Sequence, residues 1–188
     1  MSTTTAPRTG AFADLTPGVW NVDTSHSTVG FTARHLMITK VRGHFTDFDG
    51  VVTIADDPRA SSVVANVRLA SIDTGSADRD GHLRSPDFFD TDEHPEMTLR
   101  STGIRSDGDD YVLVGDLTIA GQTHPVEFAL EFDGVTQDPF GNTKAGFAAS
   151  TEINRKDWGL NWNVALETGG VLVSDKIKIE LDIQLVRS

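Results

Sequence analysis

Alternation of apolar and polar residues with a period of two runs through much of this 188-residue chain and restricts what it can fold into. In residues 176–186, five aliphatic side chains alternate with Lys, Glu, Asp and Gln side chains. Residues 113–119 and 126–132 repeat the pattern. A strand with one buried face and one solvated face is typical of an antiparallel sheet. The pattern therefore predicts an all-β protein.

Short turns separate these strands, including Ala120-Gly121 and the Pro- and Gly-containing residues 138–142. Short connections place successive strands side by side and antiparallel. We count about eight strands, the number that closes a barrel able to hold one small ligand. Residues 76–85 are polar and break the pattern, and Pro86 follows them. Asp78 lies near the start of this segment and Arg84 near its end. This order of charges and the proline predict a short helix across one end of the barrel.

The composition excludes several kinds of site. The chain has no cysteine, which rules out disulfides, thiolate nucleophiles and Cys-ligated zinc. A formal charge of −12 argues against nucleic acid as a partner, and no stretch is long enough to span a membrane. Residues 24–46 nevertheless contain no Asp or Glu and carry Arg34, His35, Lys40, Arg42 and His44. This basic segment could select an anionic ligand group, or it could be a chance cluster on a solvated strand pair.

The N-terminal residues lack the continuous apolar stretch of a secretory signal peptide. We expect residues 1–17 to be a disordered lead and residues 18–188 to form one β-barrel domain. We also expect a cytoplasmic location, or a periplasmic or secreted one if the natural chain is longer at its N-terminus.

Candidate catalytic and metal-binding groups do not converge in the predicted strands. His26, His35 and His44 are nine residues apart, but their positions along the strands differ in phase, so they should not bind one metal ion. Asp23, Ser25 and His26 contain the residue types of a nucleophile relay, yet neighbours on an extended strand point to opposite faces. We interpret Asp23, Ser25 and Ser27 as a turn leaving the first strand, and we predict no catalytic residue, no metal ligand and no cofactor.

Two aromatic and charged segments allow more than one interpretation. Arg155 could pair with Asp157 or with a carboxylate on another strand beneath Trp158, and this structural role is favoured over a ligand contact. Phe88 and Phe89 follow the predicted helix, so one ring can enter the barrel while the other closes it from outside. Further candidates for an apolar lining are Phe31, Phe45, Phe48, Phe128 and Phe147. Alternation alone does not distinguish a filled barrel from a hollow one.

Several spaced motifs together resemble the YceI-like family of polyisoprenoid-binding, lipocalin-like proteins, over about residues 18–186. They are Trp20-x-x-Asp23-x-x-His26-Ser27, Phe31 with His35-Leu36, Gly43-x-Phe45, Phe48-x-Gly50, Ser71-Ile72-x-Thr74-Gly75, Arg79-Asp80-x-His82-Leu83, Phe88-Phe89, His94-Pro95, Gly115-x-Leu117 and Asn154-Arg155-x-Asp157. Two features depart from the family pattern. The signal peptide of periplasmic members is missing, and Trp158 stands where a smaller aromatic residue is common.

The resemblance implies an extended antiparallel lipocalin-like β barrel with a long apolar cavity. It implies a bound isoprenoid lipid, either a polyprenyl chain or an isoprenoid quinone, and no established catalytic activity. We therefore expect non-catalytic binding, transport or storage of such a lipid. Two alternatives remain: an enzyme acting on an isoprenoid-type ligand, with His35 or Asp157 as acid or base, and a stress-linked interaction protein with a filled barrel.

The expected ligand contacts combine the apolar lining with the basic segment at the barrel mouth. The head group is expected near His35, Arg34 or Arg42, because His35 shares its strand phase with Phe31 and Ala33. The strongly amphipathic C-terminal strand could also pair across a homodimer. The full set of expected ligand-binding residues is Phe31, Ala33, Arg34, His35, Arg42, Phe45, Phe48, Phe88, Phe89, Phe128, Phe147 and Trp158.

Overall fold

The computed structural model describes residues 15–107 and 110–188, which form eleven strands, one α-helix and four 3₁₀ helices. The strands are β1 (Gly18–Val22), β2 (Thr28–His35), β3 (Thr39–Phe45), β4 (Phe48–Ile54), β5 (Ser62–Arg68), β6 (Ile72–Asp73), β7 (Glu96–Asp107), β8 (Asp110–Ile119), β9 (Gln122–Gln137), β10 (Thr143–Asn154) and β11 (Lys176–Arg187). The helices are α1 (Ala77–Arg84), η1 (Thr24–His26), η2 (Pro58–Ala60), η3 (Leu69–Ser71) and η4 (Arg155–Trp158).

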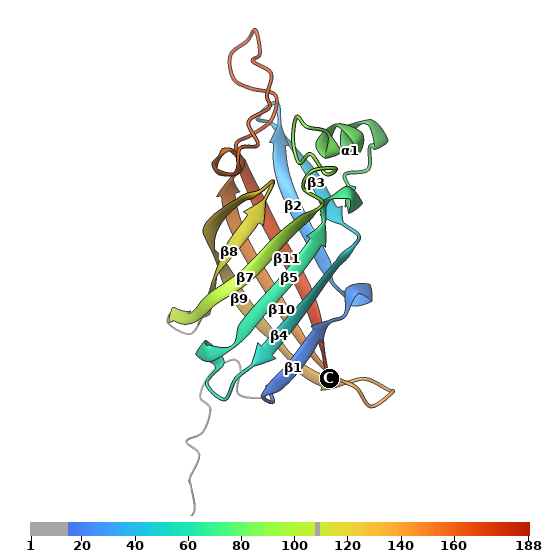
Figure 1. Ribbon diagram of the computed structural model, residues 1–188, viewed down its shortest axis with the longest axis vertical. Coiled ribbons are helices and arrows are strands. Elements are labelled where there is room, and N and C mark those ends of the chain that lie inside the picture. The colour runs from blue at the N-terminus through green and yellow to red at the C-terminus, as the bar shows by residue number, and fades with distance from the viewer. Residues whose placement is uncertain (1–14, 108–109) are drawn as a thin grey trace, which may run out of the picture.

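Eight of these strands close an antiparallel barrel in the order β1-β4-β5-β7-β8-β9-β10-β11, with β11 pairing back to β1 (Figure 1). β11 pairs with β10 along its length, from Asn154↔Lys176 to Lys144↔Val186. On its other side, β11 pairs with β1 near its C-terminal end and with β2 nearer its N-terminal end. The predicted β barrel is confirmed, and β2, β3 and β6 extend one of its ends.

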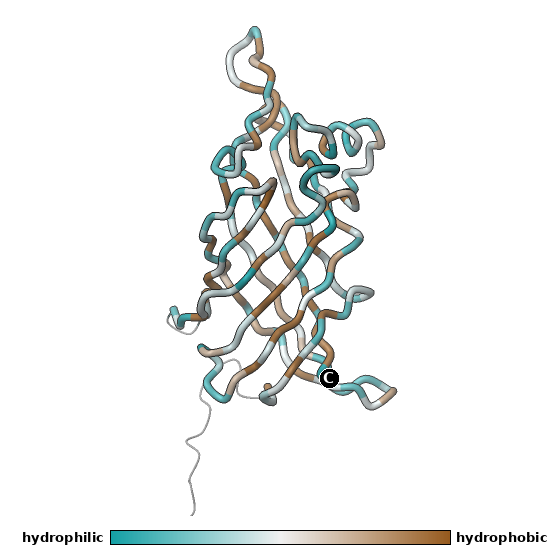
Figure 2. Tube along the Cα trace, viewed as in Figure 1, coloured by the Kyte–Doolittle hydropathy of each residue, from teal (hydrophilic) through white to brown (hydrophobic). Residues whose placement is uncertain are grey.

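The alternation seen in the sequence separates the barrel interior from its outer face. Along β11, Ile179, Leu181, Ile183 and Leu185 line the interior, while Lys178 and Glu180 form an ion pair outside. Brown and teal alternate accordingly along the strands of Figure 2. Leu15 is buried in the cluster that surrounds Trp20 at the β1 end. Residues 1–14, the rest of the expected lead, lie outside the described residues.

The predicted helix is confirmed as α1, which lies at the upper end of the barrel beside β3 in Figure 1. The Ser76 side chain accepts a hydrogen bond from the Arg79 backbone N–H at its start, and Ser85 ends it. Asp80 is buried, and its Oδ1 accepts hydrogen bonds from the N–H and the hydroxyl of Thr74 at 2.9 and 2.6 Å. This contact ties α1 to the end of β6. No described helix has the length and apolar character needed to cross a membrane.

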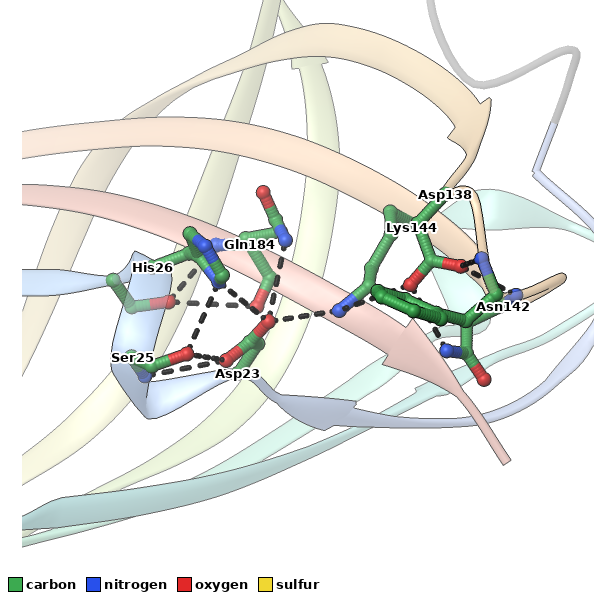
Figure 3. Close-up of polar contacts among 9 residues, drawn as sticks. Asp23, Ser25, His26, Asp138, Asn142, Lys144 and Gln184 are labelled. Atoms are coloured by element: carbon green, nitrogen blue, oxygen red, sulfur yellow. Dashed lines mark hydrogen bonds and ion pairs between the residues drawn. The ribbon is translucent and has the colours of Figure 1, made fainter.

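The 3₁₀ helix η1 separates β1 from β2, and the Asp23 side chain holds this junction in place (Figure 3). Its carboxylate accepts hydrogen bonds from Lys144 Nζ at 2.8 Å, Gln184 Nε2 at 3.2 Å and the Ser25 hydroxyl at 2.7 Å. Lys144 lies on β10 and Gln184 on β11, so one carboxylate links three parts of the barrel wall. The hydrogen bond from Lys144 is the main reason why the pKa of Asp23 lies far below its usual value.

Replacing Asp23 with Asn should lower the free energy of unfolding by about 1–3 kcal/mol at pH 7, because Lys144 loses its charged acceptor. The depressed pKa of Asp23 means that this stabilisation is present above the unfolded-state pKa of about 4 and is lost as the pH falls below it. The parent should therefore lose stability on acidification more steeply than Asp23→Asn.

Urea denaturation at several pH values measures this difference. Asp182→Asn is the matched control, because Asp182 is an exposed carboxylate on β11. This substitution should change the free energy of unfolding by less than about 0.5 kcal/mol. Equal losses in the two variants would contradict a special role for Asp23.

Candidate ligand cavity

The barrel is hollow, and its interior contains two apolar chambers. The lower chamber, toward β1 and the chain ends, has a volume of about 170 Å³. Asp49 and Ser61 are the polar residues of its described wall, and the Asp49 carboxylate is engaged by Arg68 Nη1 at 2.6 Å. Its apolar wall includes Val52, Ala65, Leu99, Leu113, Phe128, Leu130, Phe147, Ala149, Leu181 and Leu185. A chamber of this composition suits a hydrocarbon chain.

The upper chamber lies toward α1 and has a volume of about 300 Å³. Val29, Met97 and Ile179 belong to the walls of both chambers, so the two adjoin one another along the barrel axis. Aromatic rings make much of the upper wall, and Phe45 lies 5.8 Å from Phe31 and 6.3 Å from Phe89 between ring centroids. The hollow interior disfavours the filled-barrel alternative.

Gly43 makes room for one of these rings. It is the cross-strand partner of Phe31, and a Cβ atom at Gly43 would lie 2.4 Å from Phe31 Cζ. Any side chain at this position would therefore push the Phe31 ring out of its place in the wall. The Gly43-x-Phe45 motif thus has a direct steric explanation.

Five basic side chains belong to residues of the upper wall, and its described residues include no carboxylate. They are Arg34, His35, Arg79, His82 and Arg155. Arg34 and His35 are exposed at the end of β2, so this chamber has a wet rim as well as an apolar interior. Such a wall favours an anion or a hydrogen-bond acceptor over a cation.

Two of the basic residues come from α1 and are oriented by near neighbours. Arg79 donates from Nε to Thr74 Oγ1 and from Nη2 to the Thr74 carbonyl, both at 2.7 Å. His82 Nε2 lies 2.8 Å from Asp87 Oδ2, and its ring meets Trp162 edge-on at 4.5 Å between centroids. Both side chains are therefore held in position at the chamber wall, and two of the residues that hold them, Thr74 and Trp162, also line the chamber.

Arg155 is buried, with 3% of its surface exposed, although it carries a charge. Its guanidinium donates to the carbonyls of Ser174, Leu160 and Val173, and lies 3.8 Å from Asp175 Oδ1. Burial lowers the pKa of Arg155 from its usual value, and the nearby Asp175 opposes this. The favoured structural role is supported, but the partner is Asp175 and not Asp157. Arg155 also lines the upper chamber, so the two interpretations are not exclusive.

The expected ligand-binding residues are distributed over both chambers. Three of them lie in the wall of the lower chamber: Phe48, Phe128 and Phe147. Seven lie in the wall of the upper chamber: Phe31, Ala33, Arg34, His35, Phe45, Phe88 and Phe89. Their contact with a ligand stays a prediction.

Arg42 and Trp158 belong to neither wall. Arg42 lies beside Lys40 and Glu180 in a groove on the outer face of the β2-β3-β11 sheet. Trp158 is buried in the core with its Nε1 donating to the Leu117 carbonyl at 2.9 Å. Its ring meets His124 edge-on, so the extra size of tryptophan is absorbed by packing outside the cavity.

Sequence reasoning missed the contribution of the connection between η4 and β11. Leu160, Trp162, Leu172 and Val173 all line the upper chamber from this segment. The segment has no period of two and contains Gly169 and Gly170, so no pattern marked it as part of the cavity. Trp162 was the one available signal, as the single aromatic residue of this connection.

Asp23, Ser25 and His26 come together, although the prediction placed them on opposite faces of a strand. The 3₁₀ helix η1 brings them to one side (Figure 3). However, Ser25 Oγ and Asp23 Oδ2 both contact His26 Nδ1, at 3.1 and 2.9 Å. A relay needs the nucleophile and the carboxylate on different ring nitrogens. The cluster therefore serves the β1–β2 junction. Among residues 15–107 and 110–188, no three His, Asp or Glu side chains are arranged to hold a metal ion.

Comparison with known sequences identifies relatives over most of the chain. The family model described as the YceI-like domain matches residues 20–185. The UPF0312 protein SERP2314 of Staphylococcus epidermidis is 41% identical over 163 residues, which cover 86% of this chain and 93% of the relative.

Solved structures share the fold. The Campylobacter jejuni YCEI protein superposes with a TM-score of 0.71 and 28% identity, covering 88% of this chain and 96% of that protein. A polyisoprenoid binding domain from Saccharophagus degradans, implicated in plant cell wall breakdown, superposes with a TM-score of 0.68 over 90% of this chain and 98% of its own. At 14% identity, the second likeness shows the fold alone.

Proposed function

The chain belongs to the YceI-like family, and from this premise we propose that it binds, carries or stores an isoprenoid lipid in its two-chamber cavity without changing it chemically. The observation that carries the proposal is that an apolar lower chamber adjoins an upper chamber with a basic rim. A protein of the same fold is described as a polyisoprenoid binding domain, which supports the same class of ligand.

The two chambers suggest how such a ligand is oriented. We place the isoprenoid tail in the lower chamber, because its wall offers almost no hydrogen-bonding groups. The head group, a quinone, an alcohol or a phosphate, then lies in the upper chamber near His35 and Arg79. Burial of one isoprene unit contributes about 4 kcal/mol gross at about 0.8 kcal/mol per carbon group. A few units therefore supply most of the affinity.

The enzyme alternative has weaker support. Asp157, one of its two candidate groups, is exposed on η4 and belongs to neither described chamber wall. His35 reaches the upper chamber, but no carboxylate in the described wall could act with it.

Extraction of the purified protein with organic solvent, followed by mass spectrometry, tests the proposal. We expect an isoprenoid lipid at a near-equal molar ratio to protein, recovered unchanged after incubation with the protein. A chemically altered lipid would favour the enzyme alternative. No extracted lipid, together with no measurable affinity for added isoprenoids, would overturn the proposal.

The head group position can be tested with geranylgeraniol and its pyrophosphate. We expect Arg79→Gln to weaken binding of the pyrophosphate about five- to tenfold and to leave the alcohol unaffected, because it removes one charge from the rim. His35→Ala should weaken both ligands by about the worth of one hydrogen bond, roughly 1 kcal/mol. Added salt should weaken binding of the pyrophosphate alone.

Arg42→Gln is the matched control, since Arg42 lies outside the chamber wall. It should bind both ligands like the parent. Parent-like affinity in Arg79→Gln and His35→Ala together would show that the head group lies elsewhere.

A further inference from the structure

The tight turn between β2 and β3 has an unusual composition. Leu36 and Met37 occupy its two central positions with φ of 54° and 61°, and the Ile38 N–H donates to the His35 carbonyl at 3.2 Å. Two-residue hairpin turns of this kind strongly prefer Asn-Gly, because other residues are strained at positive φ. The strain at each residue is of the order of 1–2 kcal/mol. Local stability of the hairpin therefore does not explain these two residues.

The same turn exposes its apolar side chains to solvent. The exposed fractions are 38% for Leu36, 51% for Met37 and 75% for Ile38. We call these three residues the apolar tip. Three consecutive exposed apolar residues at a strained turn are more than the scattered surface hydrophobics of ordinary proteins.

The apolar tip stands at the rim of the upper chamber. The Leu36 N–H donates to the Leu172 carbonyl at 2.9 Å, and His35 forms a β-bridge with Val173. His35, Leu172 and Val173 all line the upper chamber. The connection that carries Leu172 projects beyond the barrel at the top of Figure 1, next to the end of β2. It adds a further exposed aliphatic residue, Val164.

Positive charge flanks the apolar tip. Lys40 and Arg42 follow it on β3, point to the outer face of the sheet, and form no ion pair with any described residue. Glu180 lies in the same groove, but Lys178 Nζ pairs with it at 2.8 Å, and the hydrogen bond from Lys178 is the main reason why the pKa of Glu180 is lowered. Because charges interact over about 8 Å at physiological salt, this local surface counts for more than the overall charge of −12.

From these observations we propose that the apolar tip docks on the surface of an anionic phospholipid bilayer. Leu36, Met37 and Ile38 enter the boundary between head groups and acyl chains, while Lys40 and Arg42 lie against the lipid phosphates. Charge favours this partner over a symmetric pair of copies joined tip to tip, because Lys40 and Arg42 of the two copies would repel one another. Docking turns the rim of the upper chamber toward the membrane. The proposal rests on surface residues alone and does not depend on which ligand the cavity binds.

Co-sedimentation with vesicles tests the proposal. We expect the parent to bind vesicles of phosphatidylcholine with about one-third phosphatidylglycerol at least tenfold better than phosphatidylcholine alone, with binding reduced by salt. The triple variant Leu36→Asn, Met37→Gly, Ile38→Thr should lose at least tenfold in affinity. It should also fold at least as well as the parent, because Asn-Gly suits this turn. Lys40→Gln with Arg42→Gln should remove the preference for anionic vesicles.

Phe140→Ser is the matched control. Phe140 is 89% exposed at the turn between β9 and β10, at the opposite end of the barrel, and its loss should leave vesicle binding unchanged. Parent-like binding by the tip variant, equal binding to both kinds of vesicle, or a tip-dependent dimer without vesicle binding would overturn the proposal. Any of these results would leave lipid extraction from the cavity unaffected, so failure of docking is distinguishable from failure of the proposed function.

Discussion

Replacing Ala149 with Trp is expected to abolish binding of long isoprenoids while the barrel stays folded. Ala149 lies on β10 with its side chain in the wall of the lower chamber, opposite Leu130 and Leu181. An indole in a chamber of about 170 Å³ displaces at least one isoprene unit. The lost burial of about 4 kcal/mol corresponds to a loss of roughly a thousandfold in affinity for geranylgeraniol. Titration calorimetry or displacement of a fluorescent lipid measures it.

Ala148→Trp is the matched control, because Ala148 is the next residue on the same strand and faces outward. It should bind like the parent. A charge at Phe128 would test the same chamber less cleanly, because Phe128 is buried and an unpaired charge in its place would also impair folding. If Ala149→Trp folded and still bound the lipid normally, the tail would not occupy the lower chamber.

Replacing Arg155 with Leu is expected to lower the free energy of unfolding by about 3–5 kcal/mol and the midpoint of thermal unfolding by about 10 °C or more. The substitution leaves the carbonyls of Leu160, Val173 and Ser174 without their common donor in a buried site. Asp175 Oδ1, which has no hydrogen bond from any described residue, also loses its nearby guanidinium.

Lys156→Leu is the control for this prediction. Lys156 is the neighbouring cation and lies 3.4 Å from Asp175 Oδ2, but it is exposed, so its loss should change the free energy of unfolding by less than about 0.5 kcal/mol. Differential scanning calorimetry compares the two variants. An Arg155→Leu protein with parent-like stability and reduced lipid affinity would mean that Arg155 acts as a ligand contact and not as a structural anchor.

The strands, and the side chains that line the interior, were predictable wherever one face of a strand is exposed to solvent and the other is buried. Along β11 the alternation correctly assigns Ile179 and Leu181 to the interior, because a shift by one residue would bury charged side chains. The helix was predictable from its charges and from Pro86. The extension formed by β2, β3 and β6 was not distinguishable from the barrel proper, because its strands show the same pattern.

The parts of the site that depend on irregular chain were not predictable in this way. The contact between Arg155 and Asp175 joins residues 20 positions apart, across a connection with no repeating pattern. Asp23, Ser25 and His26 were expected to diverge, because a 3₁₀ turn of three residues leaves no period to detect. The position of Arg42 outside the cavity follows from strand phase, but its length made a bend around the rim plausible from sequence alone.

Closure of the barrel by β1 and β11 has a consequence for folding during synthesis on the ribosome. Trp20 pairs with Arg187, and Asn21 Nδ2 donates to Ser188 Oγ, 167 positions later in the chain. The first strand can pair with β4 early, but its other edge stays unpaired until β11 has been synthesised, and the barrel stays open until then. Contacts between residues so distant in sequence form slowly during folding. Pulse-labelled nascent chains should accordingly stay sensitive to protease until β11 has left the ribosome and can pair with β1.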